Sequence, residues 1–177
     1  MNLSKTERLI LANQFQLLST QDNDYFGKER CLQFVTILMD GYELLYDEIF
    51  SGMNEEVSAE TCRFVLDVLS MYRTISNCFY RLPEKTLTEE DIAFAGFDGN
   101  EETKEYSFLN FFISDYYRFR DLKGNKWMEV NSHSRMVPRY IKQLEIYNSI
   151  IESKKETFQP YGYELNEEEI KRVLDLK

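Results

Sequence analysis

The sequence predicts an all-α protein built as a multihelical bundle, and three observations lead to this prediction. The chain has 7 Gly and 3 Pro among 177 residues, too few for the frequent turns that a strand-rich protein needs. Helix-capping motifs divide the chain at several points. Between them, apolar residues recur every three or four positions, which is the spacing of one helix face. About seven-tenths of the chain is expected to be helical, against a usual proportion of about one-third.

The N-terminal part of the chain predicts two helices. Residues 4–7, Ser-Lys-Thr-Glu, have the capping-box pattern, in which the serine oxygen accepts from an amide three residues later and the glutamate reaches back. A helix is expected to follow as far as about Ser19. Apolar positions in residues 31–49 predict one long or broken helix, with a kink at Gly41 and a stop at residues 51–52.

The most regular helical pattern in the chain follows Ser58, which has the side chain of a helix cap. The repeat spans under three heptads before Pro83 ends it, so we expect packing within a bundle rather than an independent coiled coil. The residues of this apolar stripe are Val65, Val68, Tyr72, Ile75, Phe79 and Leu82.

The middle of the chain predicts two further helices. Thr88, followed by three acidic residues, predicts a short helix that ends at Gly96, because acidic side chains favour the positive end of a helix dipole. Residues 98–101 predict the start of another helix. We expect this one to be the central helix, since aromatic side chains surround it. They are Tyr106, Phe108, Phe111, Phe112, Tyr116, Tyr117 and Phe119.

The last part of the chain predicts a turn at residues 123–125, an irregular segment to about Ser134, and two helices. Pro138 fits only in the first turn of the first of these helices, because proline has no amide hydrogen to donate. Residues 159–163 are expected to break that helix. Asn166, followed by three glutamates, is expected to cap a short final helix.

Length and charge fit one acidic domain spanning residues 1–177. The net charge of -10 argues against a surface that binds nucleic acid as a whole. The N-terminus lacks the charged and apolar regions of a secretion signal, and no stretch approaches the about 20 apolar residues that cross a bilayer. A cytoplasmic protein with no membrane partner is therefore expected.

The cysteines, Cys31, Cys62 and Cys78, have no paired spacing and lie in apolar helical stretches, so we expect three free thiols. Cys62 lies near the start of a predicted helix, next to Arg63. Both features lower the pKa of a thiol, so Cys62 is either a reactive cysteine or a small buried core residue.

Sequence motifs for catalysis are not found. His133 is the only histidine, which removes histidine-based metal sites, and we expect neither a metal nor a cofactor. A glycine-rich phosphate loop and a nucleophile elbow are also missing, so no catalytic residue is assigned. Asp98, Asn100 and Glu102 alternate like calcium ligands, but without the downstream glycine and glutamate a helix cap is the better interpretation.

Charge reverses sign in residues 118–142. Seven cations against Asp121 and Glu129 give this segment a net charge of +5, which leaves -15 for the rest. Either it pairs with acidic parts of the fold or of a second subunit, or it binds a phosphate-bearing ligand or single-stranded nucleic acid. The candidate ligand-binding residues are Arg118, Arg120, Lys123, Lys126, Trp127, Arg135, Arg139 and Lys142.

Four stretches resemble the YfbU family, a group of bacterial proteins of similar size. They are residues 8–14 (Arg-Leu-Ile-Leu-Ala-Asn-Gln), 60–72, 96–98 (Gly-Phe-Asp) and 168–170 (Glu-Glu-Ile). The resemblance covers nearly the whole chain and implies an N-terminal helical hairpin packed on a larger helical part. No reaction is established for the family, so the resemblance supplies no catalytic residues.

The sequence leaves two functions open. The first is a non-enzymatic cytoplasmic interaction protein that self-associates into a homo-oligomer, because the chain has many apolar helix stripes and no catalytic motif. The second is a phosphate-ligand or nucleic-acid-binding factor, or an enzyme, that uses residues 118–142.

Overall fold

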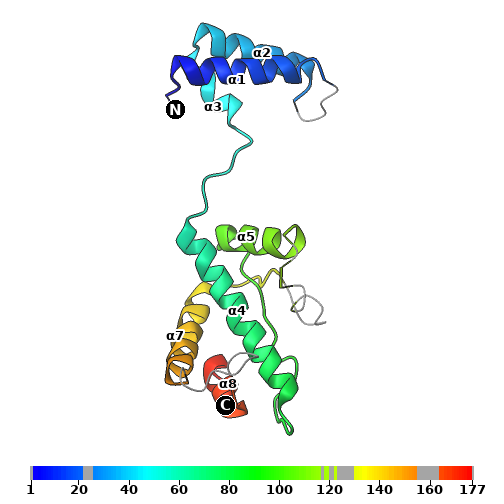
Figure 1. Cartoon of the computed structure of the whole chain (residues 1–177), viewed down its shortest axis with the longest axis vertical. Coiled ribbons are helices and arrows are strands. Elements are labelled where there is room, and N and C mark those ends of the chain that lie inside the picture. The colour runs from blue at the N-terminus through cyan, green and yellow to red at the C-terminus, as the bar shows by residue number, and fades with distance from the viewer. Residues whose placement is uncertain are drawn as a thin grey trace. The chain divides into compact units, whose positions relative to one another are not determined.

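A computed structural model describes residues 2–21, 26–116, 118–119, 122, 130–154 and 164–176. All regular secondary structure in these residues is helical, which confirms the prediction of an all-α multihelical protein. The chain divides into two compact units, Met1–Glu56 and Val57–Lys177, and each has its own apolar core (Figure 1). No helix of the described residues is long and apolar enough to span a membrane.

The N-terminal unit is built on a helical hairpin. Helices α1 (Lys5–Leu18) and α2 (Lys28–Asp40) lie side by side, followed by η1 (Glu43–Leu45) and α3 (Tyr46–Ile49) (Figure 1). The predicted capping box is confirmed: Ser4 Oγ accepts the Glu7 amide at 3.3 Å, and the Glu7 carboxylate accepts the Ser4 amide at 2.8 Å. The buried core is Ala12, Phe15, Cys31, Phe34, Ile37, Leu38, Tyr46 and Ile49.

The sequence predicts either one long helix or a broken one in residues 31–49. The structure has the broken form, and the break is at Gly41. Gly41 has a φ of +75°, in the left-handed region that favours glycine, and its amide donates to the Ile37 carbonyl to end α2. A Cβ at this position would collide with the Arg8 guanidinium, which donates to the Leu38 carbonyl at 3.1 Å. The positive φ therefore favours glycine at this turn, and a larger residue would also displace the Arg8 side chain.

The larger unit is organised around α4 (Ala59–Arg81), which contacts α5 (Thr103–Ser114), α7 (Val137–Ser153) and α8 (Glu167–Leu174) (Figure 1). Ser58 caps α4 as predicted, because its hydroxyl accepts the Thr61 amide at 3.1 Å. The predicted apolar stripe is confirmed from Val65 to Phe79, where all five members are buried, while Leu82 is partly buried.

The helix predicted to start at residues 98–101 is confirmed as α5 (Thr103–Ser114), but it starts later than predicted and is not the central helix. The Asp98 carboxylate accepts two backbone amides at 2.8 and 3.3 Å, which holds a turn, so α5 begins only at Thr103. Of the α5 side chains, Leu109 and Ile113 are buried and Phe111 is half exposed. The helix contacted on several sides is α4.

The predicted short helix at residues 88–96 is also wrong, because the structure has no helix between residues 82 and 102. The Asp91 carboxylate accepts the Thr88 amide at 2.7 Å, but only a single turn forms. The chain beyond this turn is extended and carries Phe94 and Phe97 into the core, where their rings lie 5.6 and 5.2 Å from the ring of Tyr140. Packing of these aromatic residues outweighs the local capping signal.

The C-terminal helices follow the sequence predictions. Pro138 lies in the first turn of α7, and Asn166 caps α8 in a second capping box with Glu169, through contacts of 2.8 and 2.9 Å. The turn predicted at residues 123–125 and the break predicted at residues 159–163 lie outside the described residues.

The three cysteines are free, as predicted. Cys31 and Cys78 are buried, and Cys78 Sγ accepts the Leu165 amide at 3.3 Å. Burial raises the pKa of Cys78, so this residue remains a thiol at neutral pH. Cys62 is half-buried in the first turn of α4, which leaves both of its interpretations open.

Glu167 joins the start of α8 to the segment that follows α4. Its Oε1 accepts the hydroxyl and amide of Thr86, both at 2.7 Å, and the amide of Leu87 at 2.9 Å. The side-chain bond from Thr86 is the largest cause that lowers the pKa of Glu167 from 4.5 to about 2. Because the folded pKa is the lower one, this carboxylate stabilises the fold above pH 4.5 and loses its effect as the pH falls through about 2.

We therefore expect Glu167→Gln to lower the unfolding temperature at neutral pH, and this difference from the wild type should shrink between pH 4.5 and 2. Thermal unfolding followed by circular dichroism at several pH values measures the difference. Glu168→Gln is the matched control, because Glu168 is the exposed neighbour on the same helix turn. A Glu167→Gln difference that stays constant down to pH 2 would contradict the role of this carboxylate.

Candidate functional site

The structure brings three of the eight predicted ligand-binding residues together. Arg139 and Lys142 lie on α7 and Arg135 just before it, and all three line one pocket. Arg139 and Lys142 are three residues apart, which places them on one side of α7. Arg118 is exposed and is not among the residues that line this pocket. The other four candidates, Arg120, Lys123, Lys126 and Trp127, lie outside the described residues.

The pocket lies between α7 and the end of α8 and has a volume of about 690 Å³. Small-molecule sites commonly have volumes of about 300–1,000 Å³. Three cations and one acid, Asp175, give the lining a net charge of +2. The described residues that line it are Arg135, Pro138, Arg139, Lys142, Gln143, Ile146, Val173, Leu174 and Asp175.

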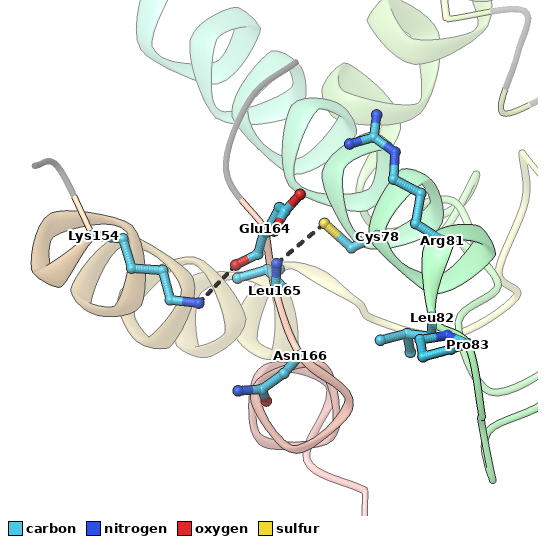
Figure 2. Close-up of a pocket in the computed structure, with 8 residues that line it drawn as sticks. All are labelled: Cys78, Arg81, Leu82, Pro83, Lys154, Glu164, Leu165 and Asn166. Carbon is cyan, nitrogen blue, oxygen red and sulfur yellow. Dashed lines mark hydrogen bonds between the residues drawn. The ribbon is translucent and has the colours of Figure 1, made fainter. Parts of the chain in front are cut away.

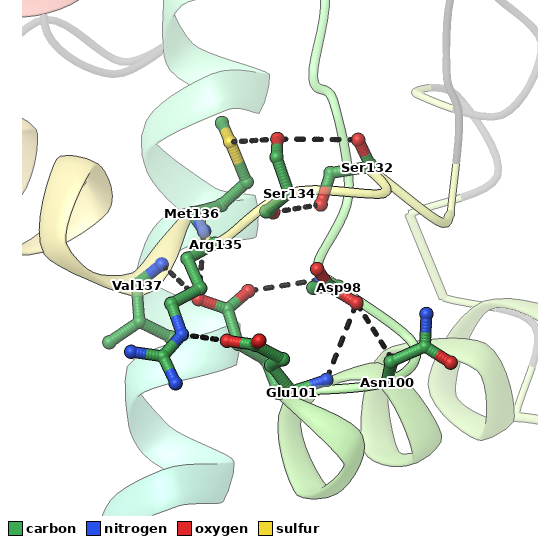
Figure 3. Close-up of polar contacts among 9 residues, drawn as sticks. Asp98, Asn100, Glu101, Ser132, Ser134, Arg135, Met136 and Val137 are labelled. Atoms are coloured by element: carbon green, nitrogen blue, oxygen red, sulfur yellow. Dashed lines mark hydrogen bonds and ion pairs between the residues drawn. The ribbon is translucent and has the colours of Figure 1, made fainter.

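The three cations differ in how far the protein already neutralises them. Arg135 forms an ion pair with Glu101 (Figure 3), and both side chains are mostly exposed. Arg139 Nη2 donates to the carbonyl of Leu174 at 3.4 Å, at the C-terminal end of α8. Lys142 is exposed and forms no ion pair within the described residues. The charge of Lys142 is therefore the most available for a ligand.

Gln143 is the polar residue of the pocket that the sequence prediction missed. Its side chain is 2% exposed, and its Oε1 accepts the Tyr72 hydroxyl at 3.1 Å. Burial raises the pKa of Tyr72 to about 12, so this hydroxyl stays protonated at neutral pH and continues to donate. Gln143 Nε2 is buried and has no hydrogen-bond acceptor among the described residues. A buried donor without a partner costs about 1–3 kcal/mol, so an acceptor at this position would stabilise it.

Glu102 positions the start of α7, next to the pocket. Its Oε1 accepts the amides of Met136 and Val137, both at 2.7 Å, and its Oε2 accepts the Asp98 amide at 3.0 Å (Figure 3). The residue before α7 provides no side-chain cap, so Glu102 caps this helix from another segment. The helix-cap interpretation of this segment is confirmed for Glu102, although the helix that it caps is α7, while the Asp98 carboxylate holds the turn before α5.

A second pocket, of about 370 Å³, lies between α4 and the start of α8 (Figure 2). Several of its polar groups bind one another, while Arg81 is exposed: the Leu165 amide donates to Cys78 Sγ, and Lys154 Nζ donates to the Glu164 carbonyl at 2.6 Å. Lys154 also pairs with Glu169 at 2.6 Å. This pocket therefore offers fewer free groups to a ligand than the α7–α8 pocket.

The described lining of the α7–α8 pocket combines cationic and apolar side chains. Asp175 is its only acid, and the described lining has neither a histidine nor a cysteine. Across the described residues, no cluster of three His, Cys, Asp or Glu side chains has the arrangement of a metal site.

Comparison with known proteins agrees with the resemblance seen in the sequence. The model of the YfbU domain matches residues 1–176. The chain belongs to the YfbU family. It is 35% identical to a UPF0304 protein of Methanocaldococcus jannaschii, over 98% of this chain and 99% of that relative. UPF0304 proteins of Pasteurella multocida and Actinobacillus succinogenes are each 27% identical, over 99% of both chains.

These relatives extend the range of organisms in which the YfbU family is found. Methanocaldococcus jannaschii is an archaeon, so the family is not confined to bacteria. The names of these three relatives state no activity and no ligand. The function of this chain is therefore inferred from its own side chains.

Proposed function

We propose that this YfbU-family protein is a non-enzymatic interaction protein of the cytoplasm that self-associates through its N-terminal hairpin. The observation that carries the proposal is a set of exposed apolar side chains on both helices of the hairpin. Ile10 and Leu17 on α1 are 55% and 59% exposed, and Leu32 and Met39 on α2 are 39% and 60% exposed. Three free cysteines fit the reducing cytoplasm.

The positions of these side chains support packing against another helix. Ile10 and Leu17 are seven residues apart and share one side of α1, opposite the buried side that carries Ala12 and Phe15. Leu32 and Met39 have the same spacing on α2. Apolar residues at this spacing are typical of helices that pack against a further helix.

A second copy of the chain is the partner that we propose. Two helices are half of a four-helix bundle, the common arrangement in which apolar faces of hairpins are covered. Most soluble oligomers are homo-oligomers with two-fold symmetry, in which the same surface is used on both copies. Ile10 and Leu17 on α1, and Leu32 and Met39 on α2, are the apolar positions that a second copy would cover.

We expect the wild-type chain to be a dimer by size-exclusion chromatography with light scattering. The double variant Ile10→Glu with Leu17→Glu should weaken the dimer at least about tenfold, because charges replace apolar contacts. Leu44→Glu is the matched control: Leu44 is 91% exposed in the same unit but lies outside α1 and α2. A wild-type monomer at high concentration, or a control that dissociates equally, would count against the proposal.

A further inference from the structure

We infer that the α7–α8 pocket binds the phosphate group of a small phosphorylated molecule. Gln143 Nε2 donates to a phosphate oxygen, and Lys142 and Arg139 provide the positive charge. This ligand site goes beyond the proposed self-association, since its residues belong to the larger unit and the hairpin belongs to the other.

The charge of the pocket matches a phosphate monoester. The lining has three cations against Asp175, and Arg135 is already paired with Glu101, so Arg139 and Lys142 are the cations available to an anion. A phosphate monoester carries a charge of about -1.5 to -2 at neutral pH, which these two cations together balance. Lys142 has no ion pair within the described residues, so binding does not require an existing pair to break.

Gln143 gives the pocket its preference for an acceptor. The Tyr72 hydroxyl donates to Oε1 at 3.1 Å, which fixes the amide with Nε2 as its free end. Because Nε2 is a donor and is buried, only a ligand atom with a lone pair satisfies it. Phosphate oxygens are strong acceptors, and their bonds to charged or amide donors are short and favourable. A cationic ligand would leave this donor unpaired and face Lys142.

The remaining lining favours a small molecule over a nucleic-acid strand. Ile146, Val173 and Leu174 form an apolar wall beside the cations, and the volume of about 690 Å³ suits one ligand with an organic part. Strand-binding sites combine several phosphate contacts with exposed aromatic platforms. Among the described lining residues there is no aromatic side chain.

Isothermal titration of the full-length protein with inorganic phosphate and with phenyl phosphate tests the site. Saturable binding is expected, with phenyl phosphate the tighter ligand because of the apolar wall. Lys142→Gln should weaken both about tenfold, since it removes a charged contact. Arg172→Gln is the matched control, because Arg172 is an exposed cation of α8 that does not line the pocket, and less than about a twofold change is expected.

The role of Gln143 is tested by Gln143→Met, which keeps the side-chain length and removes the amide. Binding of inorganic phosphate should again weaken about tenfold, with helical content by circular dichroism unchanged. If this variant does not fold, the combined variant Arg139→Gln with Lys142→Gln decides, and it should abolish binding. Unaltered affinity in either variant would overturn the assignment.

Other results of the same titrations would contradict the assignment of a phosphate site to this pocket. The inference fails if the wild type shows no saturable phosphate binding, or if Arg172→Gln weakens binding as much as Lys142→Gln. A short single-stranded RNA that binds while inorganic phosphate and phenyl phosphate do not would replace the small ligand with nucleic acid. Loss of phosphate binding in variants that remain dimers would separate this site from self-association.

Discussion

Replacing Glu102 with alanine is expected to destabilise the larger unit by about 3 kcal/mol or more. The side chain is 6% exposed, and its two oxygens accept three backbone amides, those of Asp98, Met136 and Val137. Alanine leaves all three donors without an acceptor, and each unsatisfied buried donor costs about 1–3 kcal/mol. The start of α7 has no side-chain cap of its own to replace the lost one.

Urea unfolding followed by circular dichroism measures this effect. Glu101→Ala is the matched control: Glu101 is the preceding acid, but it forms only the exposed ion pair with Arg135, so its loss should cost less than about 1 kcal/mol. Glu102→Gln should lie between the two, because an amide oxygen still accepts two of the three bonds. Equal stability of the Glu101 and Glu102 variants would show that Glu102 does not hold α7.

The features that were predictable from the sequence are those whose partners lie within one helix turn. Ser4, Ser58 and Asn166 cap their helices through amides three residues away, so the motif and the contact are in the same short segment. The apolar stripe of α4 is likewise local, because one helix period generates the face. A long, regular pattern of apolar residues therefore predicts a helix even when its tertiary contacts are unknown.

The features that could not be predicted depend on partners far along the chain. Glu102 caps a helix that begins 35 residues later, and Gln143 receives its hydrogen bond from a tyrosine 71 residues earlier. Thr88 has a good local capping signal, but buried Phe94 and Phe97 require extended chain. Tertiary packing overrides local preference at such positions.

The candidate site also has one part that was predictable from the sequence and one part that was not. Arg139 and Lys142 meet because three residues separate them on one side of α7, and this part was accessible from the sequence, whereas Arg135 precedes the helix. The second wall comes from residues 173–175 at the end of α8, and no local pattern connects that segment to α7. No sequence pattern marked Gln143 as a candidate binding residue, because a glutamine in a polar stretch is usually a surface residue.

Ile75→Asp is expected to cause the largest loss of stability, at least about 4 kcal/mol, because it places an unpaired charge in a fully buried position. Ile75 is 0% exposed, on the face of α4 that packs into the core. Domains of this size are stable by about 5–15 kcal/mol, so the larger unit should lose at least about a quarter of its stability. Thermal unfolding by circular dichroism, with Asn77→Asp as an exposed control on the same helix, measures the loss.

The N-terminal unit should remain folded in the Ile75→Asp variant. Its core, built around Phe15 and Phe34, shares no residue with the core around Ile75. Part of the helical signal should therefore persist at temperatures where the larger unit has unfolded, with a separate transition at a higher temperature or a broad one. Wild-type stability would show that position 75 is accessible to water. A single transition that removes all helical signal would show that the two cores unfold together.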